Sequence, residues 1–230
     1  MDNTPSTPKT AARKRALIFL GPPGAGKGTQ AKAIAQNFSA PHLSTGDMFR
    51  DHVARGTDLG LKAKPIMASG ALVPDEIVLG MVAERISRPD CASGFVFDGF
   101  PRTIPQAEKL DEMLVEKGFG RPLVIHFAVD YDFLFRRLTG RRSCKVCGEI
   151  YNIHDRPPKA EGRCDKDGGE LIHRPDDRED VIRQRLSAYD KQTKPLIEYY
   201  RGQSALRDVD GAADAAAVTR AVLEVLARPD

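Results

Sequence analysis

The stretch that decides the fold is ALIFL at residues 16–20, followed at once by GPPGAGKGTQ at residues 21–30. An apolar run that ends at a Gly-Pro turn is typical of a strand buried on both faces of a parallel sheet. Gly21, Gly26 and Lys27 fit the G-x-x-x-x-G-K core of a phosphate-binding loop. Glycines let successive amides face one anion, and the helix that follows adds partial positive charge. The stretch therefore predicts a site for nucleotide phosphates.

Two details narrow this interpretation. A dinucleotide-binding fingerprint fits poorly, because Thr29 stands where its third glycine should be. Gly28 follows Lys27 where such loops usually carry Ser or Thr, so the usual hydroxyl ligand of Mg²⁺ is displaced to Thr29 or absent.

Strand and helix patterns alternate along the rest of the chain. Buried strands are predicted at 95–97, 123–127 and 206–209, and helices from the loop to 38 and at 47–55, 61–69, 75–88, 104–117, 131–139, 178–201 and 214–227. This alternation predicts an α/β protein with helices on both faces of a parallel sheet. Pro195 is expected to break or kink the helix at 178–201. Residues 1–13, rich in Thr, Pro, Ser and Lys, are expected to form a disordered tail.

Composition excludes several classes of protein. The 230 residues, with 41% hydrophobic and 29% charged side chains, are ordinary for a globular chain. The net charge of +3 is too small to indicate nucleic acid by itself. No stretch approaches the ~18–20 apolar residues of a membrane span, and ALIFL is shorter than the ~7–15 residues of a signal-peptide core. We expect a cytoplasmic protein with neither a membrane partner nor a nucleic-acid partner.

Residues 141–175 interrupt the alternation and carry a pattern typical of metal ligands. Cys144-x-x-Cys147 is followed by sixteen residues and then by Cys164-x-x-Asp167. Two short turns of this kind can bring four ligands together around structural Zn²⁺, and a carboxylate can complete the site. Another divalent metal in the same ligands stays open. Spacing makes His154, Asp165 and His173 weaker candidates, and Cys91 is predicted to be a small buried hydrophobic residue.

Two further motifs connect the chain to a known family. Residues 44–50 read STGDMFR, and residues 98–102 read DGFPR at the predicted carboxyl end of a strand. Together with GPPGAGKGTQ they resemble the adenylate kinase family, in its long-lid form with a zinc-binding lid. The resemblance runs from about residue 15 to the C-terminus. It implies a P-loop core at 14–43, 74–139 and 178–230, a mobile segment for the nucleoside monophosphate at 44–73, and a lid at 140–177.

The same resemblance implies an activity and a role for each matching residue. The reaction is Mg²⁺-dependent transfer of the terminal phosphoryl group of ATP to AMP, which gives two ADP, by a monomer. ATP would contact Gly24, Ala25, Gly26, Lys27, Gly28, Thr29, Arg137, Arg141, Ile150, Tyr151 and Ala213. AMP would contact Thr45, Arg50, Ala71, Leu72, Val73, Gly99, Phe100, Pro101, Arg102, Gln106, Arg174 and Arg185. Asp98 would organise Mg²⁺ through waters, and Asp176 and Asp177 would orient cations or Mg²⁺-bound waters. The catalytic set would be Lys27, Arg102, Arg141, Arg174 and Arg185.

The chemistry agrees with this resemblance, because phosphoryl transfer needs positioning and charge neutralisation more than covalent catalysis. Arg13, Arg136, Arg142, Arg163 and Arg183 are expected to be solvated surface charges. Two alternatives stay open. One is another nucleoside monophosphate kinase, acting as a GTP:AMP or a UMP/CMP enzyme. The other is a zinc-ribbon protein that binds nucleic acid, favoured by the basic pairs at 136–137 and 141–142 but short of aromatic residues that could stack on bases.

Overall fold

The computed structural model describes residues 15–228, so the predicted tail at 1–13 and Arg13 lie outside the described residues. Five parallel strands form the central sheet in the order β2-β3-β1-β4-β8. They are β1 (Arg15–Leu20), β2 (His42–Ser44), β3 (Gly94–Asp98), β4 (Leu123–Ala128) and β8 (Leu206–Asp210). The α/β class expected from the sequence is confirmed.

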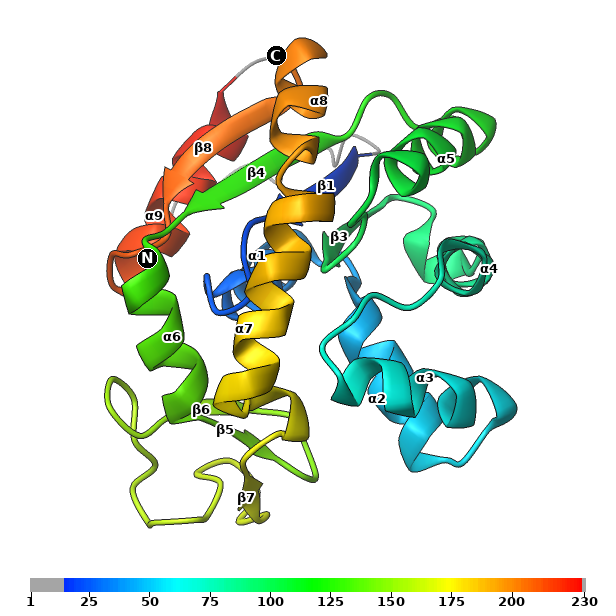
Figure 1. The fold of residues 1–230 in the computed structure, drawn as a ribbon. Coiled ribbons are helices and arrows are strands. Elements are labelled where there is room, and N and C mark those ends of the chain that lie inside the picture. The colour runs from blue at the N-terminus through cyan, green and yellow to red at the C-terminus, as the bar shows by residue number, and fades with distance from the viewer. Residues whose placement is uncertain (1–14, 229–230) are drawn as a thin grey trace, which may run out of the picture.

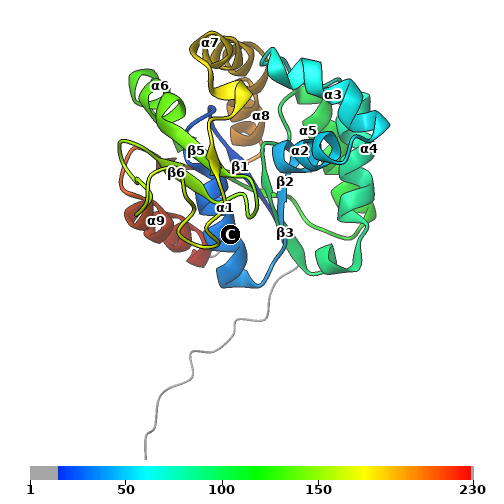
Figure 2. The ribbon, with the colours of Figure 1, turned by 90° about the horizontal axis from the view of Figure 1, so that it is seen from below.

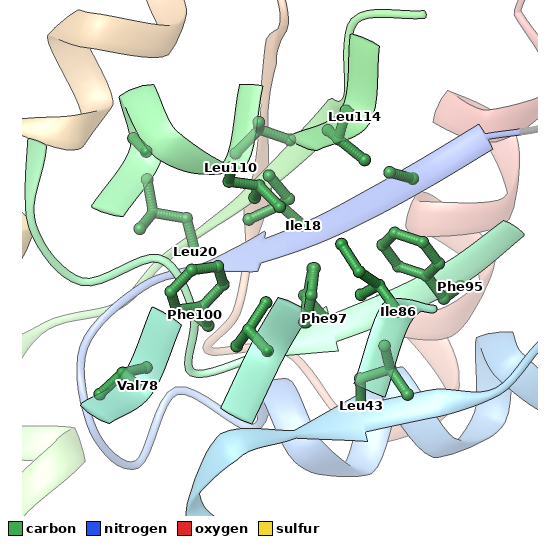
Figure 3. Packing of buried hydrophobic residues seen from close by; sticks show 14 of the residues in the cluster. Ile18, Leu20, Leu43, Val78, Ile86, Phe95, Phe97, Phe100, Leu110 and Leu114 are labelled. Atoms are coloured by element: carbon green, nitrogen blue, oxygen red, sulfur yellow. The ribbon is translucent and has the colours of Figure 1, made fainter. Parts of the chain in front are cut away.

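Helices cover both faces of this sheet (Figure 1). One face packs against α4 (Asp75–Ile86), α5 (Ile104–Glu116) and α8 (Leu196–Gly202), and the other against α1 (Lys27–Phe38), α6 (Tyr131–Gly140) and α9 (Ala215–Ala227). Figure 3 shows Ile18 and Phe97 of the sheet beside Leu110 of α5, and each of these three side chains is fully buried. Burial of one such side chain stabilises the fold by ~1.5–3 kcal/mol. The central sheet is therefore a stable base for the loops that leave it.

The strand order places two important loops side by side. The chain leaves β1 at the middle of the sheet, and β3 and β4 pair with β1 from opposite sides. Phe19 pairs with Asp98, so the loop after β1 and the loop after β3 start next to each other. In open α/β sheets ligands bind at such a reversal of strand order, outside the carboxyl ends of the strands.

Two smaller parts lie beyond this end of the sheet. Helices α2 (Thr45–Ala54) and α3 (Asp58–Ala68) form one, and a three-stranded antiparallel sheet in the order β6-β5-β7 forms the other. Its strands are β5 (Arg141–Cys144), β6 (Ile150–Asn152) and β7 (Leu171–Ile172). Seen from below, β5 and β6 lie on one side of the molecule and α2 and α3 on the other (Figure 2). We call the part that contains β5–β7 the lid.

The structure differs from the sequence-based expectations in three places. Strand β2 and the three lid strands carried no clear periodicity and were not predicted. The predicted helix at 178–201 is α7 (Glu179–Ala188), a π-helical segment (Tyr189–Thr193) and then α8. The break falls just before Pro195, because proline has no amide hydrogen to donate within a helix. Two short 3₁₀ helices, Pro89–Cys91 and Pro175–Asp177, complete the described elements.

Candidate active site and metal centre

The loop after β1 is shaped to hold an anion. Gly24 and Gly26 have φ values of +86° and +84°, a region that glycine adopts without strain. Gly26 is the N-cap of α1 and brings no side chain, so the first amides of this helix face the cleft end of the loop with their donors available. Lys27 Nζ donates to the carbonyl oxygens of Gly21 and Pro22, each at 2.8 Å. The lysine therefore arches over the loop that would hold the phosphates.

Asp98 and Lys27 form the charged base of the site. Burial lowers the pKa of Lys27 to about 8, although the nearby Asp98 carboxylate opposes this shift. Burial acts to raise the pKa of Asp98, but the His42 imidazole and the charge of Lys27 outweigh it and hold that pKa below its usual range. His42 Nε2 lies 3.8 Å from Asp98 Oδ2. Asp98 is therefore an ionised carboxylate beside the phosphate loop.

The structure explains why position 28 carries glycine where such loops usually carry Ser or Thr. A Cβ added there would lie 3.0 Å from Asp98 Oδ2, closer than side chains ordinarily approach. The Asp98 carboxylate therefore occupies the space that a Ser or Thr side chain would need. Thr29, the other candidate hydroxyl, is exposed and lines the same cleft.

One cleft of about 720 Å³ connects the phosphate loop with the lid and with α2. Its lining contains each residue predicted above for the two nucleotides and for Mg²⁺, with the exception of Phe100 and the fully buried Asp177. The Phe100 side chain is 1% exposed and packs against Phe97, with ring centroids 5.3 Å apart. The ring therefore lies in the core, where burial stabilises it, and a contact between AMP and the backbone of Phe100 stays a prediction. Ala213 and the lid residues Ile150 and Tyr151 do line the cleft.

Arginines from four separate segments converge on this cleft. Arg141 donates from Nε and Nη2 to both carboxylate oxygens of Asp177, and Arg185 Nη1 lies 3.0 Å from Asp177 Oδ1. Arg102 Nε donates to the Gly99 carbonyl at 2.8 Å, and Arg174 Nε to Ser143 Oγ at 2.7 Å. Asp177 is fully buried, and its carboxylate binds the guanidinium groups of both Arg141 and Arg185.

The electrostatics of this cluster favour an anionic ligand. Burial and the charges of neighbouring guanidinium groups lower the pKa values of Arg102 and Arg174. Arg141 shows the opposite shift, because the Asp177 carboxylate outweighs burial and raises the pKa of this guanidinium. The cations are thus held close together against their mutual repulsion, and a polyanion would relieve that repulsion.

The remaining arginines behave mostly as expected. Arg136, Arg163 and Arg183 are exposed, and Arg183 lies over the Phe135 ring. Arg142 is half-buried and donates to the carbonyl oxygens of Thr139 and Arg141, so the expectation of a solvated surface charge is wrong for this residue. The backbone where α6 meets β5 binds its guanidinium instead.

The four predicted metal ligands come together in the lid. The ligand atoms of Cys144, Cys147, Cys164 and Asp167 all lie within 4.8 Å of one another. The Sγ atoms of Cys147 and Cys164 are 3.6 Å apart, and Cys144 Sγ is 3.3 Å from Asp167 Oδ1. Zinc bonds of ~2.3 Å to sulfur and ~2.0–2.2 Å to oxygen in a tetrahedron require ligand separations of ~3.5–3.8 Å. The donor set therefore fits Zn²⁺.

Local turns explain why the ligands converge. Each ligand pair is followed by a glycine with positive φ, Gly148 at +67° and Gly168 at +70°. Gly148 N donates to the Cys144 carbonyl at 3.2 Å, and Gly168 N donates to the Cys164 carbonyl at 2.9 Å. The two turns are equivalent, and each presents its ligands on one side. His154, Asp165 and His173 are not part of this cluster, and Cys91 is fully buried, as the sequence indicates.

Sequence reasoning missed several charged or titratable residues of the cleft: Lys32, His42, Asp47, Asp155, Arg156 and Asp214. His42 faces the cleft because β2 pairs in register with β3, with Ser44 beside Asp98, and no local signal reveals that pairing. Lys32 Nζ donates to the Gly148 carbonyl at 3.2 Å, so α1 touches the lid directly. Its charge on the helix that follows the phosphate loop is the one signal that could have identified it.

Comparison with known proteins agrees with this geometry. The family model described as adenylate kinase matches residues 19–205. The chain is similar to an adenylate kinase of Archaeoglobus fulgidus, with 51% identity over 91% of this chain and 97% of the relative. It is also similar to adenylate kinases of Thermodesulfovibrio yellowstonii (54% identity, 85% and 91% covered) and Desulforudis audaxviator (50% identity, 92% and 99% covered). Within residues 15–228, none of the helices has the length and apolar character needed to cross a bilayer. On the family match and these nearly full-length relatives, the chain belongs to the adenylate kinase family.

Proposed function

We propose that the described cleft transfers the terminal phosphoryl group of ATP to AMP, with the residues and roles given below. As a member of its family the chain is an ATP:AMP phosphotransferase. One observation supports the placement of the chemistry most strongly. A single cleft holds a phosphate loop, a second pocket beside α2, and buried guanidinium groups from both sides of the gap.

The donor side of the cleft is assigned to ATP. The amides of residues 24–29 and the ammonium of Lys27 hold the phosphates, and Arg137 and Arg141 approach from the lid side. Arg137 Nη1 donates to the Gly211 carbonyl at 3.0 Å, which places this guanidinium beside Ala213 at the base end. Ile150 and Tyr151 cover the ribose and base from the lid.

The acceptor side is assigned to AMP. Arg50 and Arg102 bind its phosphate together with Arg174 and Arg185, while residues 71–73 and Gln106 line its base pocket. Thr45 Oγ1 donates to the Gly99 carbonyl at 2.9 Å, which ties the start of α2 to the loop after β3. The backbone of 99–101, including Phe100, forms the floor between these two segments.

Two metal ions complete the proposal. Asp98 would hold Mg²⁺ through waters, and its low pKa keeps it ionised for that role. Mg²⁺ neutralises charge on the phosphates during transfer. Zn²⁺ in the Cys₃Asp site is structural, because four ligands leave no open position for substrate. It supplies the folding free energy that the lid, with few buried apolar residues, lacks.

Within the cleft the protein positions the reactants and excludes water. The segment at 44–73 and the lid at 140–177 act as two covers over a core formed by the rest of the fold. Closure brings Arg141, Arg174 and Arg185 onto the phosphoryl group in transfer, where they stabilise its charge. An AMP phosphate oxygen then attacks the γ-phosphorus of ATP in line, the bond from that phosphorus to the β,γ-bridging oxygen breaks, and ADP leaves as the second ADP forms. Water, the competing acceptor, is shut out.

A direct assay tests this proposal. The protein is mixed with Mg-ATP and AMP, GMP, UMP or CMP in turn, and the nucleoside diphosphates are quantified. AMP is expected to be the preferred acceptor, and Lys27→Met protein purified in parallel controls for contaminating kinases. Replacing ATP by GTP distinguishes a GTP:AMP enzyme. A preference for UMP or CMP would overturn the assignment of the acceptor pocket.

We further propose that the protein is a monomer in a reducing compartment such as the cytoplasm, where thiolates can hold Zn²⁺.

A further inference from the structure

A carboxylate outside the predicted site links the N-termini of two helices at the acceptor pocket. Asp75 is the first residue of α4, and each of its carboxylate oxygens accepts one hydrogen bond from the start of α5. Gln106 Nε2 donates to Asp75 Oδ1 at 2.7 Å, and Thr103 Oγ1 donates to Asp75 Oδ2 at 2.9 Å. Asp75 thus binds directly to the side chain assigned to the AMP base.

The second partner of the Gln106 amide is the Arg102 backbone N–H, which donates a hydrogen bond where Asp75 accepts one. Arg102 N donates to Gln106 Oε1 at 2.8 Å, and the Gln106 residue is 1% exposed. A backbone N–H can only donate a hydrogen bond, and an ionised carboxylate can only accept one. A flipped amide would set oxygen against carboxylate and NH₂ against N–H, so that both bonds would be lost. The chemistry of the two partners therefore allows one orientation of the amide.

This orientation matters for recognition of the base. After the bonds to Asp75 and Arg102, the Gln106 amide retains one free N–H and one oxygen lone pair for the cleft that it lines. Adenine offers an amino donor at C6 and an acceptor at N1. Guanine and hypoxanthine offer the reverse, an oxygen acceptor at C6 and a donor at N1. A fixed amide can complement only one of these two patterns.

We propose that Asp75 is a positioning residue that fixes the amide of Gln106 and thereby makes the acceptor pocket selective for adenine over 6-oxopurines. The inference rests on the proposed placement of the AMP base against Gln106. A role limited to helix capping explains less of the arrangement, because Thr103 Oγ1 already caps α5 by accepting from Gln106 N at 3.2 Å.

The test compares acceptors in matched variants. Asp75→Ala is expected to raise KM for AMP about tenfold, because the loss of one buried hydrogen bond weakens binding by about this factor. The values of kcat and of KM for ATP should stay nearly unchanged. The ratio of kcat/KM for AMP to that for IMP or GMP should fall by a similar factor. Asp75→Asn should restore most of the selectivity, because its Oδ1 can accept from Gln106 while its Nδ2 donates to Thr103. Glu76→Ala is the control, since Glu76 is an exposed acid in the same helical turn.

The outcomes separate this inference from the proposed function. If Gln106→Ala lowers the AMP:IMP ratio and Asp75→Ala does not, the positioning role is overturned while the reaction stands. If Gln106→Ala changes neither the KM for AMP nor the ratio, the placement of the base is overturned as well. Should Asp75→Ala fail to fold, Asp75→Ser carries the test, because a hydroxyl can both donate and accept and so no longer holds the amide in one orientation from this side, which leaves only the Arg102 N–H to do so. An unchanged ratio in Asp75→Ser would then overturn the inference.

Discussion

Removal of the charge of Asp177 is the sharpest test of the guanidinium cluster. The side chain is fully buried, and it binds Arg141 through both oxygens and Arg185 through Oδ1. Asp177→Asn keeps the volume and one carbonyl acceptor but removes the negative charge. The Arg141 and Arg185 guanidinium groups then lose the carboxylate that they share, and Asp176, whose Oδ2 lies 3.1 Å from Arg185 Nη1, remains as a partner of Arg185.

The size of the effect follows from burial. Removal of one partner from a buried ion pair costs ~3–5 kcal/mol. The Arg141 and Arg185 side chains remain 15% and 17% exposed, and asparagine keeps an acceptor, so we take the lower end, ~3 kcal/mol. For a domain of this size each kcal/mol lowers Tm by ~2–4 °C, which predicts a fall of ~6–12 °C.

Thermal unfolding and steady-state kinetics on the same preparations test this value. We expect the fall in Tm together with a lower kcat, because both guanidinium groups lose the anchor that aims them at the phosphates. Asp180→Asn is the matched control, since Asp180 is exposed and lies 3.9 Å from Arg178. A fall in Tm below about 2 °C for Asp177→Asn would refute the reasoning, because that is the scale of an exposed pair.

Two further predictions concern the loop and the lid. Lys27→Met should fold with an unchanged Tm and lose most of its activity; a rate near that of the unaltered enzyme would contradict the loop assignment. The purified protein should contain about one zinc per chain by elemental analysis, and a chelator should remove it and lower Tm. Asp167→Cys should retain the metal, since thiolate is an equally good ligand. Loss of the metal in that variant, or an unchanged Tm without metal, would contradict the structural role.

Local patterns of the sequence were sufficient for the core and for the metal ligands. The run at 16–20 is apolar throughout and ends at a turn, so β1 and the loop after it could be placed directly. The Cys-x-x-Cys and Cys-x-x-Asp spacings identified ligands that the lid does bring together. In both cases the signal lies within a few neighbouring residues, and the rest of the fold does not alter it.

Features that depend on distant partners could not be predicted in this way. β2 has three residues and forms a strand only because β3 offers it a register. The strand β5 reads RRSC, which has no apolar alternation, and it is held between β6 and β7. The motif around Phe100 did not reveal that the ring of this residue packs against Phe97 in the core. Asp75 and Asp177 look like ordinary surface acids in the sequence, and only the packing shows what they bind.

The net charge of +3 gave no sign of an anion-binding site, because net charge does not show where the charged residues lie in the fold. The chain gathers Lys27 and several arginines in one cleft, while most of its acids lie elsewhere on the surface. Burial and mutual repulsion lower the pKa values of Lys27, Arg102 and Arg174, so bringing these cations together costs free energy. Asp177 offsets part of that cost at Arg141 and Arg185. Under the proposed assignment, the remainder would be offset by the phosphates of the two nucleotides, most fully when both are bound. Closure would then depend on the acceptor as well as the donor, which is the condition under which transfer to water is suppressed.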